Sequence, residues 1–281
     1  RNISDKQNVG EYVTRLKYEM KIIEDKEFLD YFLMVSDVVK FAKNAGIPVG
    51  PARGSAAASL VCYLLRITEV DPLAFPNLLF ERFIEPTRKD LPDIDLDFDD
   101  RRRHEIRGYL VSKYGEASVG NIGSFTTYKS KLALDDVGRV HGIPKAAVGT
   151  VKELLLERSS GDLRASATIE DTANMFEAAA EVFDNFPNLK YAIDLEGQVK
   201  GMGVHAAGLV VANGNLTQTC ATYTRVVAGR EVSVLSVDKY DAEYLNVLKI
   251  DVLGLTTLGM ISRCLEAIDK PLSWLYEIPL D

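Results

Sequence analysis

The stretch Leu91-Pro92-Asp93-Ile94-Asp95-Leu96-Asp97-Phe98 decides how the rest of this chain is interpreted. Acidic and apolar residues alternate along it, and a period of two is typical of a β-strand. On a strand, the three aspartates would point to one face and the apolar side chains to the other. Neighbouring carboxylates repel one another, and aspartate is a poor strand former, so the pattern indicates a site. A divalent cation is the simplest partner for such a row.

The composition is that of an ordinary globular protein. The chain has 281 residues, 47% of them hydrophobic and 26% charged, which allows one large domain or two smaller ones. No apolar run reaches the roughly 18 residues that cross a bilayer, and no signal peptide opens the chain. We therefore expect no membrane partner.

Net charge and cysteine content indicate the cellular location and limit the possible partners. The three cysteines are far apart and fit neither a disulfide framework nor a zinc site, which favours a reducing, cytoplasmic location. The net charge of −8 argues against nucleic-acid binding by the whole surface, but it allows a local basic groove. The last residues have no tail character, so we expect the chain to be part of a longer protein.

The hydrophobic periodicity predicts a mixture of helices and strands, and so an α+β (mixed α/β) fold. Apolar residues recur with a helical period in several segments and alternate in others. Helices are expected over 11–26, 27–45, 56–65 and 99–114 and, with interruptions, over 145–195, and strands over 208–212, 231–235 and 247–255.

A turn rich in glycine and proline precedes the helix expected over 56–65. Backbone N–H groups at Gly54 and Ser55 would be exposed at this helix N-terminus, which suits an anion. Arg53 adds a charged fork of donors suited to phosphate, and Arg82 could reach the same anion or lie on the surface. The Gly-Lys-Ser/Thr ending of a Walker loop is absent. The alternative is a helix that is merely capped after a tight turn.

Two basic segments are candidates for contact with a nucleic-acid backbone. Arg102 and Arg103 belong to a run of arginines at the start of the helix expected over 99–114. A second segment carries Lys129, Lys131 and Arg139. Charge runs are usually solvated helix faces, so this alternative stays open beside a phosphate contact.

A second charged pair lies far along the chain. Lys249 and Asp251 are two residues apart in a segment with strand alternation, so they share one face. Such a pair could form an ordinary salt bridge across strands. Because the acidic stretch needs a neighbour, we expect these two residues to lie beside it.

Three interpretations of the acidic stretch compete. A calcium loop is rejected because Phe98 and His104 stand where an EF-hand needs glycine and glutamate. An exposed edge strand whose acids deter aggregation is a structural alternative. The third is a two-metal site, in which two carboxylates of one strand and a third from another hold ions about 4 Å apart. The nearby Gly-Ser turn, arginine and lysine favour this site and a nucleotidyl transfer.

In this order, the motifs resemble those of the C-family bacterial replicative DNA polymerases, the family of the catalytic alpha subunit of DNA polymerase III. The similarity covers most of the chain and is weakest from about residue 145 to 200. The matching segments are Gly50-Pro51-Ala52-Arg53-Gly54-Ser55-Ala56-Ala57, Leu79-Phe80-Glu81-Arg82-Phe83, Pro92-Asp93-Ile94-Asp95-Leu96-Asp97-Phe98, Asp136-Val137-Gly138-Arg139-Val140, His205-Ala206-Ala207-Gly208 and Lys249-Ile250-Asp251-Val252-Leu253-Gly254-Leu255.

The resemblance implies a palm like the nucleotidyltransferase core of the polymerase-beta family, with a helical thumb inserted between its halves. The palm would comprise 1–124 and 204–256, the thumb 125–203, and the truncated start of the fingers 257–281. Such a fragment should bind metal and nucleotide, and it would need its missing parts to extend a primer.

The resemblance also assigns roles to single residues. Asp93, Asp95 and Asp251 match the catalytic acids, which would hold two Mg²⁺ ions, with Mn²⁺ as a substitute. Asp97 matches a position that is not usually counted as a metal ligand. Gly54, Ser55, Arg82 and Lys249 match positions that hold the incoming triphosphate, and Arg53 is added because of its charge. The residues expected to contact DNA are Arg102, Arg103, Lys129, Lys131 and Arg139, from the basic segments above, and His205, whose alternative role is to orient a loop.

The activity expected from these roles is template-directed DNA synthesis, in which the primer 3′-hydroxyl attacks a deoxynucleoside triphosphate and releases pyrophosphate. The partners would be template-primer DNA, deoxynucleoside triphosphates and, for the full-length protein, a sliding clamp, a clamp loader and an exonuclease subunit. Two alternatives stay open, a template-independent nucleotidyltransferase and an inactive DNA-binding fragment.

Overall fold

The computed structural model describes residues 8–85, 87, 92–158, 165, 167–227, 229–245, 247–276 and 278. Leu91, which opens the acidic stretch, lies outside these residues. The chain forms two compact units, one built from Arg1–Gly123 with Val204–Asp281 and the other from Ser124–Gly203. The first unit is therefore discontinuous in sequence, and the second is inserted into it.

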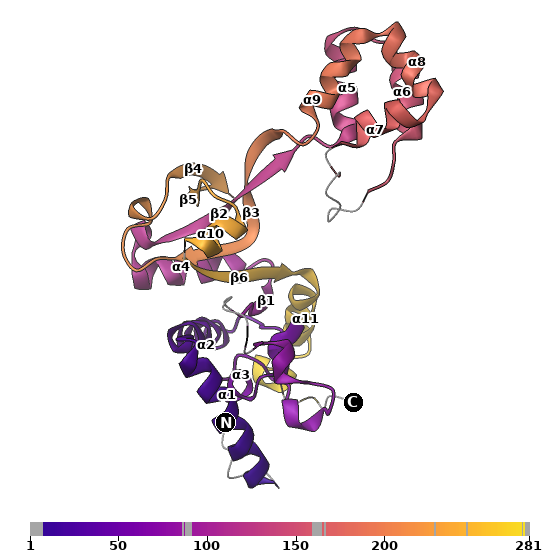
Figure 1. Cartoon of the computed structure of the whole chain (residues 1–281). Coiled ribbons are helices and arrows are strands. Elements are labelled where there is room, and N and C mark those ends of the chain that lie inside the picture. The colour runs from indigo at the N-terminus through magenta and orange to yellow at the C-terminus, as the bar shows by residue number, and fades with distance from the viewer. Residues whose placement is uncertain are drawn as a thin grey trace. The chain divides into compact units, whose positions relative to one another are not determined.

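A mixed six-stranded sheet organises the first unit (Figure 1). The strands follow the order β1-β6-β3-β2-β5-β4 across the sheet. Together with the surrounding helices, this sheet confirms the predicted mixture of α and β structure. The strands are β1 (Asp95–Asp99), β2 (Val119–Thr127), β3 (Val199–Val211), β4 (Thr222–Val227), β5 (Arg230–Leu235) and β6 (Leu248–Leu255).

The strand pairing brings distant parts of the chain together. Strand β1 runs parallel to β6, with Asp95 opposite Asp251. Strand β3 runs antiparallel to β6 on its other side and places Gly208 opposite the same Asp251. Strand β2 is parallel to β5, and β4 is antiparallel to β5. The acidic strand and the Lys249 strand are thus direct neighbours, as the sequence predicted.

Strand β1 lies at an edge of the sheet, and a loop covers that edge. The Gly50 N–H donates to the Asp97 carbonyl at 2.8 Å, and the Asp99 N–H donates to the Pro48 carbonyl at 3.3 Å. A Cβ on Gly50 would lie 3.0 Å from the Asp97 Cβ, so this close approach favours glycine. Asp95 and Asp97 therefore lie on an edge strand whose backbone is partly paired, unlike the exposed edge of the structural alternative.

The helices agree with the periodicity in most places. They are α1 (Val9–Asp25), α2 (Leu29–Asn44), α3 (Leu60–Leu64), α4 (Arg103–Tyr114), α5 (Ser130–Val140), α6 (Lys145–Leu154), α7 (Thr168–Met175), α8 (Glu177–Asn185), α9 (Tyr191–Leu195), α10 (Lys239–Tyr244), α11 (Thr256–Ala267) and α12 (Leu272–Leu275). Across the described chain, none of them combines the length and hydropathy of a bilayer-spanning segment.

One helix prediction is wrong. The segment expected to form a single helix over 56–65 divides at Ser59 into a 3-10 turn, η2 (Gly54–Ala58), and the short helix α3. Ser59 has an extended backbone, and its hydroxyl accepts a hydrogen bond from the Cys62 N–H, so it caps α3. The Gly-Ser segment therefore lies in a 3-10 turn, not at the N-terminus of an α-helix.

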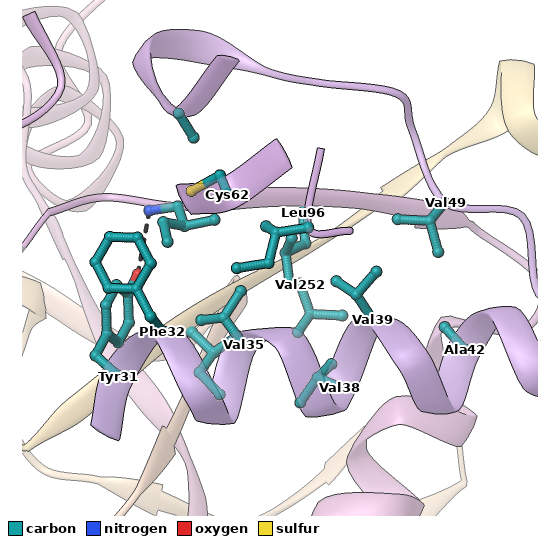
Figure 2. Close-up of a cluster of buried hydrophobic side chains, with 14 of the residues drawn as sticks. Tyr31, Phe32, Val35, Val38, Val39, Ala42, Val49, Cys62, Leu96 and Val252 are labelled. Carbon is teal, nitrogen blue, oxygen red and sulfur yellow. Dashed lines mark hydrogen bonds between the residues drawn. The ribbon is translucent and has the colours of Figure 1, made fainter. Parts of the chain in front are cut away.

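The core of the first unit lies between α2 and the apolar face of β1 and β6 (Figure 2). Val35 and Val39 of α2 are fully buried, and Leu96 and Val252 face them from the two strands. The Tyr31 hydroxyl accepts a hydrogen bond from the Ile94 N–H at 3.1 Å. Helix α2 therefore packs against the strands and also fixes the backbone between Asp93 and Asp95.

The second unit has a core of its own, built by α5 to α9 (Figure 1). These helices confirm the helical character predicted for this part of the chain. Its fully buried apolar residues are Ala133, Leu134, Val151, Ile169, Ala179, Leu189 and Ala192.

Candidate active site

Three carboxylates meet where β1 begins. Oxygens of Asp93, Asp95 and Asp251 all lie within 4.8 Å of one another. Asp95 is the first residue of β1, Asp251 is its partner on β6, and Asp93 lies two residues before the strand. The parallel pairing of β1 with β6 thus builds the cluster, whose exposure increases from buried Asp251 to exposed Asp93.

Asp97 does not belong to this cluster. It follows Asp95 by two residues on the strand, as the alternation predicted, but its carboxylate accepts a hydrogen bond from Arg53 Nη1 at 3.0 Å. Asp93 lies before β1 begins, so the predicted row of three acids within one strand is wrong. Asp97 instead forms an ion pair that holds Arg53 beside β1.

The residues of the cluster fit a divalent cation. Asp251 Oδ1 is buried and has no hydrogen-bond partner among the described residues, an arrangement that costs about 1–3 kcal/mol if nothing binds the oxygen. Burial and the charges of Asp93 and Asp251 raise the pKa of Asp95, because its ionised form is insufficiently compensated. A cation with a preference for oxygen ligands, such as Mg²⁺ or Mn²⁺, would satisfy both.

A lysine bridges two of the acids. Lys249 Nζ lies 3.0 Å from Asp251 Oδ2 and 3.5 Å from Asp93 Oδ1. Its side chain is only 15% exposed, so its charge acts in a poorly solvated setting. The spacing of two residues on β6 brings Lys249 to the acid face, as predicted.

The Gly-Ser turn lies against the same acids. Gly54 has φ +57°, in the left-handed region that favours glycine, and a Cβ there would lie 3.8 Å from Asp95 Oδ2. Arg53 Nε lies 3.6 Å from the same oxygen. The turn packs against a second 3-10 turn, η4 (Phe80–Arg82), whose Arg82 is exposed and forms no ion pair with any residue that the structure describes. Arg53 and the Gly54 turn therefore lie beside the carboxylate cluster, and the turn that carries Arg82 packs on them.

A buried glutamate, which the sequence analysis missed, holds this turn in place. Glu19 of α1 is fully buried and accepts hydrogen bonds from Ser59 Oγ, the Leu60 N–H and the Val61 N–H at 2.9–3.1 Å. Arg15 pairs with Glu19 at 2.6 Å and donates to the Ala58 carbonyl at 2.8 Å. An acid on the apolar stripe of the helix over 11–26 was the signal that could have revealed it.

The predicted DNA-binding residues of the first unit have varied surroundings. Arg102 donates to the carbonyls of Ala45 and Gly46 at 3.1 Å, so it satisfies the C-terminus of α2. Arg103 lines a cavity under α4. His205 Nδ1 accepts a hydrogen bond from the Gly208 N–H at 2.8 Å, which leaves Nε2 as the protonated nitrogen of a neutral ring. DNA contact by these residues stays a prediction.

In the second unit, the predicted DNA-binding residues cluster on α5. Lys129 immediately precedes this helix, and Lys131 lies in its first turn. Arg139, in its last turn, is exposed and pairs with Asp136 at 3.2 Å. Neither lysine forms an ion pair with any other residue in the described part of the chain, so both charges are accessible for phosphate.

Comparison with known proteins identifies the family. The family described as "Bacterial DNA polymerase III alpha NTPase domain" matches residues 1–254, and the chain belongs to it. This confirms the resemblance that the acidic motif indicated.

Curated relatives named DNA polymerase III subunit alpha match most of this chain. The relative from Buchnera aphidicola subsp. Acyrthosiphon pisum is 37% identical over 268 residues, 94% of this chain and 22% of its own length. Those from Deinococcus radiodurans and Yersinia pestis are each 40% identical over 89% of this chain, and over 18% and 20% of their own lengths. The chain thus spans about a fifth of the length of these relatives.

Proposed function

We propose that this chain is the palm and thumb of a template-directed DNA polymerase, which joins a deoxynucleoside triphosphate to a primer 3′-hydroxyl and releases pyrophosphate. The palm would comprise 1–124 and 204–256, the thumb 125–203, and the fingers would begin at 257. One observation carries the proposal: Asp93, Asp95 and Asp251 meet beside a left-handed glycine turn and a lysine.

The acids would hold two Mg²⁺ ions, for which Mn²⁺ can substitute. When bound, such ions lower the pKa of the attacking hydroxyl and neutralise charge on the phosphates. Asp251 would contribute the oxygen that now lacks a partner, and Asp95 and Asp93 would complete the ligand set. The raised pKa of Asp95 supports this role, because a cation at this position would compensate the charge that is now unfavourable.

The cations around the cluster would bind the triphosphate. Arg53 and Lys249 lie within 3.6 Å of the cluster carboxylates, so they bring positive charge to the place where the triphosphate would bind. In the complex these side chains, with Arg82 and the N–H groups of Gly54 and Ser55, would donate to phosphate oxygens. The short distances of Arg53 and Lys249 from the acids support this assignment.

The partners follow from the same proposal. Template-primer DNA would contact Lys129, Lys131 and Arg139 in the thumb and His205 in the palm. The relatives are named as a subunit, which supports the expectation that the longer polypeptide assembles with a clamp, a clamp loader and an exonuclease subunit.

The first experiment is calorimetric titration of Mn²⁺ into the intact polypeptide, with and without dATP, followed by primer extension on a defined template. Asp95→Asn is expected to weaken metal-dependent dATP binding and to slow extension by more than about 100-fold. The matched control is Asp30→Asn, which removes an exposed carboxylate from α2.

Three outcomes would contradict the proposal. Primer extension by Asp95→Asn at the wild-type rate would show that the carboxylate cluster is not needed for the reaction. Extension that ignores the template sequence would indicate a template-independent nucleotidyltransferase. DNA binding without turnover or metal dependence in the wild-type polypeptide would indicate an inactive binding protein.

A further inference from the structure

A cavity of 470 Å³ lies under α4, away from the carboxylate cluster. Leu209 of β3, Val232 of β5 and Val252 of β6 form its floor. Val252 follows Asp251 on the same strand, and successive side chains point to opposite faces of a sheet. The cavity is therefore on the face opposite the acids, and its volume is in the range that small ligands occupy.

Four arginines and one acid, Asp100, line this cavity. The arginines are Arg101, Arg103, Arg107 and Arg230. Arg101 pairs with Asp99 at 2.7 Å, and Arg107 has a longer contact of 3.1 Å with the exposed Glu116. The side chains of Arg103 and Arg230 form no hydrogen bond or ion pair with any residue in the described ranges. Guanidinium groups bind phosphate oxygens through paired donors, so this wall favours a phosphate-bearing ligand.

We propose that this cavity binds a nucleoside phosphate, independently of the metal cluster. The phosphate would pair with Arg103 and Arg230, and the organic part would pack on the aliphatic floor. A nucleic-acid backbone fits this site less well, because it has no apolar group to fill the floor.

The test is calorimetric titration of the intact polypeptide with dAMP in EDTA. Without divalent metal the carboxylate cluster is not expected to contribute, so this result does not depend on the proposed polymerase function. The double variant Asp93→Asn, Asp95→Asn should bind dAMP like the wild type. Arg103→Ala and Arg230→Ala should each weaken binding at least about tenfold.

Controls separate the roles of charge, phosphate and base. Arg263→Ala removes the same charge from an exposed position on α11 outside the cavity, and it should leave dAMP binding unchanged. Pyrophosphate and deoxyadenosine should each bind at least about tenfold more weakly than dAMP, because each lacks half of the contacts. Thermal unfolding of every variant would verify its fold.

The proposal fails under any of four results. These are no dAMP binding in EDTA, binding that Arg103→Ala and Arg230→Ala leave intact, binding that the double aspartate variant loses, and pyrophosphate binding as tight as that of dAMP. If a single-stranded oligonucleotide binds through Arg103 and dAMP does not bind, the arginines of the cavity contact a nucleic-acid backbone instead.

Discussion

The two faces of the β1–β6 pair differ sharply although they share one backbone. On one face, Leu96, Phe98 and Val252 are at most 3% exposed and pack in the core with α2. On the other, Asp95 and Asp251 crowd together, and one buried oxygen has no partner. The apolar face supplies the stability that the acidic face lacks, so a strand with poor intrinsic propensity still forms.

The largest effect is expected when the apolar face is broken. Phe98→Ala removes a fully buried ring from β1 and leaves a cavity, so the free energy of unfolding should fall by about 3–5 kcal/mol. Urea unfolding of wild type and variant measures this difference. A loss below about 1 kcal/mol would mean that the apolar face does not support the strand.

A smaller effect of opposite sign is expected on the acidic face. In EDTA, Asp95→Asn should raise the free energy of unfolding by up to about 1 kcal/mol, because it relieves repulsion from Asp93 and Asp251. Saturating Mn²⁺ should reverse the order, since binding to the native state stabilises the wild type. Thermal unfolding in both conditions tests this, and a variant less stable than the wild type in EDTA would refute it.

The smallest effect concerns the link between the two helices behind the apolar face. Asp37 of α2 accepts hydrogen bonds from Tyr109 and Lys113 of α4, each at 2.6 Å. Burial alone would raise the pKa of Asp37, but these two partners outweigh it and hold the pKa below its usual value. Asp37→Asn should cost about 0.5–1 kcal/mol at pH 7, because the pair is partly exposed.

The difference in unfolding free energy between wild type and Asp37→Asn should depend on pH. An acid with a lowered native pKa stabilises the fold above its ordinary pKa of about 3.9 and loses that contribution as the pH falls through the native value. Urea unfolding from pH 7 to pH 2 should therefore show wild type and Asp37→Asn converging at the acidic end. A constant difference would mean that ionisation of Asp37 is irrelevant.

Local patterns predicted much of the site. The acidic alternation and the spacing of Lys249 and Asp251 depend on strand geometry alone, so both segments were located before their pairing was known. The first two helices were also found, since their apolar stripes have a helical period. The family resemblance then assigned these distant segments to one site, which periodicity alone could not do.

Tertiary contacts decided what the sequence could not show. The helix break at Ser59 depends on Glu19, a residue forty positions earlier that receives the backbone donors of α3. Asp97 pairs with Arg53 and is not part of the acid cluster. Arg102 donates to the backbone carbonyls that follow α2. No local pattern specifies these partners, because each comes from a distant element.

The parallel pairing of β1 with β6 also bears on how the chain folds during synthesis. Strand β1 ends at Asp99, whereas β6 begins only at Leu248, after the whole helical insert. The insert has local contacts and its own core, so it can fold as soon as it leaves the ribosome. The acidic strand has to wait for its partner β6, so the carboxylate cluster is assembled only after the insert has been synthesised.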